Sequence, residues 1–124
     1  MLKYNSNLEE RLIDFAVRII RAAESLPRTK IGQHIGGQLM RSGTSPAPNY
    51  GEAQDAESRA DFVHKMKIAL KELRETKVWL QMVVKASLIS PASKLDSLVS
   101  EADQLISIFV SSIKTAKQNN RKRE

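Results

Sequence analysis

Hydroxyl side chains that could serve as nucleophiles gather in one stretch of the chain, residues 38–62, which reads QLMRSGTSPAPNYGEAQDAESRADF. Ser42, Thr44 and Ser45 would each need an adjacent general base to become reactive. No feature of the sequence places a histidine beside them, and hydroxyls within a helix more often donate to a carbonyl one turn earlier. We therefore predict structural roles for these side chains.

Carboxylates form a second group with possible chemistry, at Glu52, Asp55, Glu57 and Asp61. Such a run is more often a solvated face, or one that forms ion pairs between subunits, than an acid–base pair. We predict no catalytic residues and no enzymatic activity. The alternative is an enzyme hidden among the polar residues, which would need a solvent-open pocket at Arg41, Asn49 and Glu52.

Metal and cofactor chemistry lacks its usual ligands. The chain has no cysteine, which excludes disulfides, thiolate zinc sites and cysteine nucleophiles. A di-metal helical bundle needs two Glu-x-x-His pairs and none occurs, since Asp61 and His64 alone have a carboxylate-to-histidine spacing. The glycine-rich segment 32–37 lacks the Lys-Ser/Thr ending of a phosphate-binding loop. We expect neither a metal nor a cofactor.

The composition is that of one globular domain with a basic surface. Of the 124 residues, 41% are apolar and only 5% aromatic, so the core must be mainly aliphatic, which suits helix packing. The net charge of +6 points to polyanionic partners, with nucleic acid ahead of anionic membranes. The N-terminus lacks the apolar segment of a secretory signal, and no run approaches the roughly 18 apolar residues that span a bilayer. We expect a cytoplasmic protein and no membrane partner.

Apolar residues recur at three- and four-residue steps in four stretches, which predicts four amphipathic helices. We expect the N-caps of the four helices within residues 5–7 and at Thr29, Ser58 and Ser90, with Pro91 as the first residue of the last helix. The first helix should end at Ser25–Pro27 and the third at residues 86–89. Short connections imply antiparallel neighbours. We predict an all-α, up-down-up-down four-helix bundle over residues 1–118, followed by a basic tail, residues 119–124, that is disordered when unbound.

Two prolines should interrupt the second helix. Pro46 and Pro48 lack the N–H groups that would bond the carbonyls of Ser42 and Thr44. Either the helix kinks there, or a new helix starts with Ser45 as N-cap and Pro46 as its first residue.

The turn between the second and third helices predicts which residues lie at the same height. If the chain reverses near Glu57–Ser58, positions whose numbers sum to about 115 face one another, which pairs Arg41 with Glu75 and Gly36 with Trp79. The first pair would be a hydrogen-bonded charge pair, and the second would let an indole fit beside a glycine backbone. The polar residues along this contact form either a buried structural seam or a binding site, and they are Arg41, Ser42, Thr44, Asn49, Glu52 and Glu75.

Basic residues gather on one helix face and at the C-terminus. Lys67, Lys71 and Arg74 recur at four- and three-residue steps on the polar face of the third helix. The end of the chain adds Lys114, Lys117, Arg121, Lys122 and Arg123. All of these are candidate nucleic-acid-binding residues. We expect them to contact phosphates, because the chain has few aromatic residues for stacking on bases.

Several short motifs resemble a known bacterial family. They are QLMRSGTS at 38–45, NYGEA at 49–53, SRADF at 58–62, KELRET at 71–76 and WL at 79–80. In this order they cover most of residues 10–85, and they resemble the four-helix bundle proteins related to those encoded by intervening sequences of 23S rRNA genes. The resemblance implies a homopentameric ring of bundles with no established enzymatic activity. It also implies a fold shared with the accessory protein of diversity-generating retroelements, a basic pentamer that works with a reverse transcriptase and nucleic acid.

Two functions fit these features. The first is a non-enzymatic, oligomeric adaptor that contacts RNA or DNA backbones through its basic surfaces. The second is a protein-interaction scaffold, for example an accessory of a reverse transcriptase or another nucleic-acid enzyme, without direct nucleic-acid binding. Adjacent apolar residues such as Ile19–Ile20 and Ile108–Val110 widen the apolar stripes, which indicates either a second buried face for self-association or a larger core.

Overall fold

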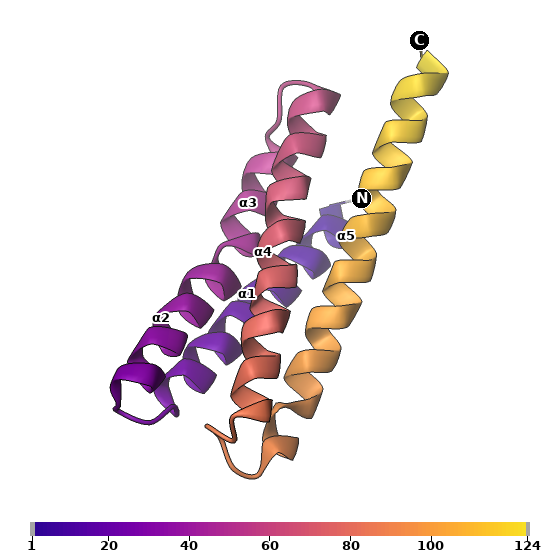
Figure 1. Ribbon diagram of the computed structural model, residues 1–124. Helices are drawn as coiled ribbons and strands as arrows, with labels where there is room; N and C mark the ends of the chain where they lie inside the picture. Colours follow the sequence, from indigo (N-terminus) through magenta and orange to yellow (C-terminus); the bar gives the residue numbers. More distant parts are fainter. Residues whose placement is uncertain (1, 124) are drawn as a thin grey trace.

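Every regular element of the described chain is helical. The computed structural model describes the backbone of residues 2–123 and the side chains of residues 7–119. Its elements are α1 (Leu2–Glu24), α2 (Lys30–Thr44), α3 (Pro46–Gln54), α4 (Arg59–Lys85), a single 3₁₀ turn η1 (Ala92–Leu95) and α5 (Asp96–Arg123). Figure 1 shows four antiparallel arms, because α2 and α3 follow one another alongside α4 as a single arm. The predicted all-α four-helix bundle is therefore confirmed.

The core is built from the predicted apolar stripes. The large side chains with almost no exposed surface include Leu12, Phe15 and Ile19 of α1, Leu39 of α2, Met66, Leu73 and Leu80 of α4, and Leu105 and Phe109 of α5. Their spacing of three, four or seven residues turns one face of each helix inward. Burying a side chain of this size contributes about 1.5–3 kcal/mol relative to leaving it exposed. Aliphatic burial between the arms is therefore the main stabilising contribution.

Two predicted helix starts are confirmed and two are wrong. The Thr29 hydroxyl accepts from the Gly32 N–H at 3.1 Å, and the Ser58 hydroxyl accepts from the Asp61 N–H at 3.1 Å. Helix α1 begins at Leu2 instead of within residues 5–7, since Asn and Ser are only mildly unfavourable inside a helix. Pro91 is not the first residue of a helix. Its backbone is extended, and η1 carries the chain from there into α5.

Helix α4 ends at Lys85 with Ala86 as its C-cap, one residue before the predicted range of 86–89. The next residues close its end by a Schellman motif, in which the Leu88 N–H donates to the Val83 carbonyl at 3.0 Å and the Ser87 N–H donates to the Val84 carbonyl at 3.1 Å. Ser87 takes the left-handed conformation that this motif requires, with φ of 54°. At the other end of the bundle α5 runs to Arg123. The side chains of residues 120–124 lie outside the described part, so the disorder expected for residues 119–124 stays a prediction.

The interruption expected at the prolines lies at Ser45. Pro46 is the first residue of α3, as one of the two alternatives proposed, but the Ser45 side chain forms no capping hydrogen bond. Ser45 keeps helical dihedral angles, with φ of −73° and ψ of −37°, and its carbonyl accepts from the Asn49 N–H at 3.2 Å. The chain therefore kinks and continues in nearly the same direction.

Helix α2 approaches α1 closely through its glycines. A Cβ atom built on Gly43 would lie 2.6–2.9 Å from three side-chain atoms of Ile19, which is too close for any larger residue without movement. Gly36 also faces α1, near Ala23 and Leu26, so its predicted pairing with Trp79 is wrong. Equal height does not bring two residues into contact when one of them points toward a third helix.

None of the helices in the described part combines the length and the apolar character that a membrane crossing requires.

Candidate nucleic-acid interface and the polar network beside it

Three cations on the outward face of α4 have no carboxylate partner among the side chains that the structure describes. Lys67, Lys71 and Arg74 are exposed, and within residues 7–119 none of them forms an ion pair or a side-chain hydrogen bond. Two neighbouring lysines on the flanks of the same helix are paired. Lys65 contacts Glu52 at 3.0 Å, and Lys77 contacts Asp103 at 2.6 Å. The outward face thus presents positive charge that no carboxylate of residues 7–119 neutralises.

Lys85 extends this row of charge and was missed in the sequence. It lies 18 residues beyond Lys67, which is five complete helical turns, so the two side chains share one face of α4. Lys85 is exposed and has no ion-pair partner among the described residues. We call Lys67, Lys71, Arg74 and Lys85 the basic stripe. It spans about 27 Å along the helix.

Helix α5 adds a cation beside the stripe. The contact between Lys77 and Asp103 fixes the antiparallel register of α4 and α5. Lys114 is exposed and lies 11 residues beyond Asp103, about three turns, so it occupies the same face of α5 toward the Lys67 end of the stripe. Lys117 is also exposed, and it has an interaction of its own. The predicted contributions of Arg121, Lys122 and Arg123 fall on side chains outside the described residues.

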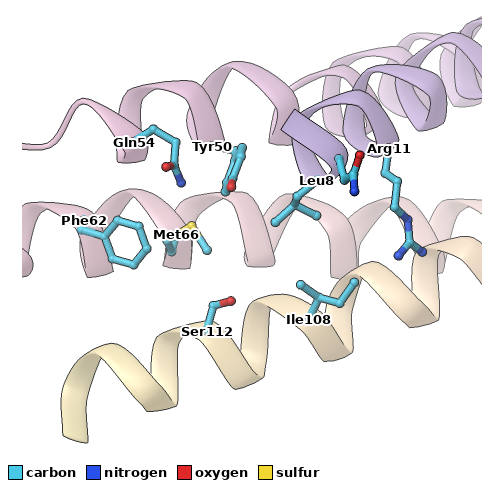
Figure 2. A pocket seen from close by; sticks show the side chains of 9 residues that line it. Leu8, Arg11, Tyr50, Gln54, Phe62, Met66, Ile108 and Ser112 are labelled. Carbon is cyan, nitrogen blue, oxygen red and sulfur yellow. The ribbon is translucent and has the colours of Figure 1, made fainter. Parts of the chain in front are cut away.

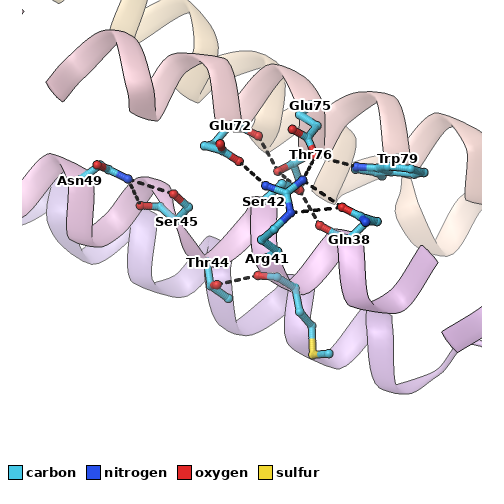
Figure 3. A network of polar contacts seen from close by, with 11 residues as sticks. Gln38, Arg41, Ser42, Thr44, Ser45, Asn49, Glu72, Glu75, Thr76 and Trp79 are labelled. Atoms are coloured by element: carbon cyan, nitrogen blue, oxygen red, sulfur yellow. Dashed lines mark hydrogen bonds and ion pairs between the residues drawn. The ribbon is translucent and has the colours of Figure 1, made fainter. Parts of the chain in front are cut away.

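A polar network joins α2 to α4 around Arg41 (Figure 3). Arg41 Nη1 donates to Glu72 Oε2 at 3.1 Å, and Arg41 Nη2 pairs with Glu75 Oε2. The second contact confirms the predicted Arg41–Glu75 pair. Gln38 Oε1 accepts from Arg41 Nε and Nη2, and the Trp79 indole N–H donates to Glu75 at 3.0 Å. The Arg41 side chain is 51% exposed, so this network lies on the surface and is screened by solvent.

Two hydroxyls lie buried beneath this network. Ser42 and Thr76 have no exposed surface, and their hydroxyl oxygens are 2.9 Å apart. Ser42 donates to the Gln38 carbonyl at 2.9 Å, and Thr76 Oγ1 lies 2.7 Å from the Glu72 carbonyl oxygen. Each hydroxyl therefore serves its own helix and the neighbouring one, which is the structural use that the sequence predicted for Ser42.

The other residues of the predicted seam form separate local contacts. Thr44 donates to the Met40 carbonyl, and Asn49 donates to the backbone and the hydroxyl of Ser45. Glu52, which is exposed, pairs with Lys65. The structure thus brings together Arg41, Ser42 and Glu75, and it gives Thr44, Asn49 and Glu52 different partners.

The residues missed in this network are Gln38, Glu72, Thr76 and Trp79. The available signal was their helical spacing, since Gln38 and Ser42, Glu72 and Thr76, and Glu75 and Trp79 are each four residues apart. The arrangement supplies ion pairing between helices. Among the described residues no three His, Asp or Glu side chains converge as a metal site would need.

Comparison with known proteins identifies the family. The family model for the 23S rRNA-intervening sequence protein matches residues 5–111. A similar solved structure is that of a protein with unknown function from the S23 ribosomal protein family of Bacteroides thetaiotaomicron VPI-5482. It is 34% identical in sequence, has a TM-score of 0.80, and aligns over 86% of this chain and 98% of its own. No curated protein matches. The chain belongs to the family of 23S rRNA-intervening sequence proteins.

Proposed function

We propose that this protein is a non-enzymatic, oligomeric binder of RNA or DNA that contacts the phosphate backbone through the basic stripe. The observation that carries the proposal is the contrast along α4. Lys65 and Lys77 are neutralised by carboxylates, whereas Lys67, Lys71 and Arg74 between them are exposed and have no ion-pair partner within the described side chains. A row of unpaired cations on a straight helix matches the repeated negative charge of a nucleic-acid backbone.

Binding of this kind reads charge and shape instead of sequence. Tyr50 is buried, and Trp79 is half-buried with its N–H bound to Glu75 and its ring edge to face with His34, so the described residues offer little aromatic surface for stacking on bases. Contacts to phosphate position a protein on nucleic acid without selecting a sequence. We therefore expect similar affinity for different sequences of one nucleic-acid type.

We further propose that the protomer assembles as a homopentameric ring in the cytoplasm. A ring needs two different, complementary patches on each protomer. Candidates among the described residues are Ile13, Val17 and Ile20 on α1 and Ile31 and Met40 on α2, all of which are exposed. Val78 and Met82 on α4 are exposed too, but they lie on the face that carries the basic stripe and are left out of the interface. The resemblance noted in the sequence supplies the number five. Such a ring would repeat the basic stripe in every protomer and multiply the net charge of +6.

Salt-dependent binding tests the function. A labelled single-stranded RNA and a labelled DNA duplex, titrated by filter binding in about 50 and about 300 mM KCl, should bind at the lower salt. Three phosphate contacts on duplex DNA predict a loss of about 100-fold between the two conditions. Absence of binding to both nucleic acids at the lower salt contradicts the proposal. That outcome favours the alternative, a scaffold that docks an acidic or nucleic-acid-bound protein such as a reverse transcriptase.

A further inference from the structure

A partly enclosed cavity lies where four helices meet, at the end of the bundle that carries the α3–α4 turn. Residues of α1, α3, α4 and α5 line it, and its volume is about 390 Å³. Figure 2 shows these side chains directed toward the same space from opposite sides. The volume falls within the roughly 300–1,000 Å³ of typical small-molecule sites. The cavity shares no residue with the basic stripe.

The wall of the cavity is largely apolar. Leu8 of α1, Phe62 and Met66 of α4 and Ile108 of α5 contribute aliphatic, aromatic and thioether surface. Met and Phe side chains can adapt to a flat ring and contact its face or edge. The wall therefore suits a flat apolar body.

Tyr50 supplies a hydrogen-bonding group that no residue among 7–119 engages. Its side chain is only 3% exposed, and its ring packs edge to face against Phe109 with centroids 6.0 Å apart. Figure 2 shows its hydroxyl turned toward the cavity, and within residues 7–119 that hydroxyl has no hydrogen-bond partner. Burial, and then the negative charge of Glu9, raise the pKa of Tyr50. The phenol is therefore a neutral donor at physiological pH.

Charge in the lining is already neutralised. Of the described residues that line the cavity, Arg11 is the charged one, and it donates to Glu101 through Nε at 3.1 Å and Nη2 at 2.7 Å. This hydrogen bond raises the pKa of Arg11, so the ion pair persists at neutral pH. Gln54 and Ser112 add uncharged polar groups at the edge. A ligand that carried a net charge would have no free counter-charge in the lining.

We infer that this cavity binds an uncharged, flat, amphipathic small molecule, with its apolar ring against Phe62 and Met66 and a hydrogen-bond acceptor facing the Tyr50 hydroxyl. The inference does not depend on nucleic-acid binding, because the site and the basic stripe share no side chain. It assigns the polar edge a role in orienting the ligand and the apolar wall the larger share of the affinity.

Three ligand probes of similar size and different charge test the inference on the full chain. They are 4-(trifluoromethyl)benzamide, 4-(trifluoromethyl)benzoate and 4-(trifluoromethyl)benzylammonium, each titrated by ¹⁹F NMR at neutral pH. The amide should bind with a Kd below about 1 mM, as expected for a ligand of this size. Both ions should bind at least about tenfold more weakly, since they lose hydration without gaining a counter-charge.

Two further measurements fix the location of the bound probe. Tyr50→Phe keeps the ring packing and removes the hydroxyl, and it should weaken amide binding about five- to tenfold. In ¹H–¹⁵N spectra of the wild type, the amide probe should shift the resonances of residues around 50, 62 and 108. Undetectable binding of the amide at about 5 mM contradicts the inference. This holds also if the reason is that a second copy of the chain occupies the cavity. Equal binding of all three probes, unchanged affinity in Tyr50→Phe, or shifts elsewhere contradict it as well.

Discussion

The hydroxyl oxygens of Ser42 and Thr76 lie 2.9 Å apart in a contact between α2 and α4 that has no exposed surface. Each oxygen is also within hydrogen-bond distance of a carbonyl of its own helix, so both groups are satisfied without water. The pair fixes the height of one helix against the other directly beneath the exposed Arg41 network.

Thr76→Val removes this link while keeping the shape of the side chain. We expect the free energy of unfolding to fall by about 1 kcal/mol, the usual net contribution of one hydrogen bond. Ser42→Ala should cost a similar amount, and the double variant should cost less than the two single changes together. Urea unfolding of all four proteins measures the coupling. Strict additivity would show that the two hydroxyls do not interact.

Gly43→Ala and Gly37→Ala should change stability in opposite directions. A methyl group on Gly43 would meet Ile19 at 2.6–2.9 Å, and such overpacking typically costs about 1–3 kcal/mol. Nothing lies within 4 Å of the corresponding position on Gly37, so that variant should gain up to about 1 kcal/mol from helix propensity alone. Thermal unfolding of the two variants makes the comparison. Stabilisation by Gly43→Ala would contradict the close α1–α2 contact.

Tyr50 should make stability depend on pH in alkaline solution. Because its pKa in the folded state is raised above the ordinary value of about 10, the unfolded chain loses the proton first as pH rises. The resulting stabilisation is complete below about pH 10 and disappears as pH rises through the folded-state pKa. Urea unfolding at about pH 8 and about pH 11 should therefore show a larger loss for the wild type than for Tyr50→Phe. Equal losses would show that burial does not perturb this phenol.

Val17→Asp should disrupt the proposed ring. Val17 is 39% exposed and lies between Ile13 and Ile20, the other exposed apolar residues of α1. A carboxylate at this position would be buried without a partner on assembly. Light scattering should give five times 13.9 kDa for the wild type and a smaller mass for the variant. Ser107→Asp is the matched control, because Ser107 of α5 is exposed and polar and is not one of the exposed apolar residues. Its mass should equal that of the wild type. A wild-type protein that is monomeric at micromolar concentration contradicts the assembly.

Sequence reasoning succeeded where helical geometry fixes the outcome. The caps at Thr29 and Ser58 follow from residue type and spacing, and the antiparallel turn was enough to bring Arg41 to Glu75. It was less successful for orientation around a helix axis. Gly36 lies at the height expected opposite α4 but faces α1, because the approach of α2 to α1 at Gly43 turns that face away.

The cavity beside Tyr50 could not be anticipated from the sequence. Its lining comes from four separate helices, and periodicity gives no information about how far apart two packed helices lie. The sequence also did not show whether the cations of the basic stripe form ion pairs. Only the structure shows that Glu52 and Asp103 engage Lys65 and Lys77, while Lys67 and Lys71 find no carboxylate in the part of the chain whose side chains are described.

Removal of the unpaired charge tests the central claim most directly. The variant Lys67→Gln/Lys71→Gln/Arg74→Gln deletes three cations of the basic stripe. A matched control deletes three exposed cations on α1, in the α1–α2 turn and at the start of α2, Arg21→Gln/Arg28→Gln/Lys30→Gln.

The measurement is the affinity for a DNA duplex as a function of salt, made on both triple variants and the wild type. The stripe variant should lose more than about tenfold in affinity at 50 mM KCl, and its salt slope should fall by up to about 2.7. The control should keep its affinity within about threefold. Equal losses in the two variants, or no loss in the stripe variant, would contradict nucleic-acid binding through this face of α4.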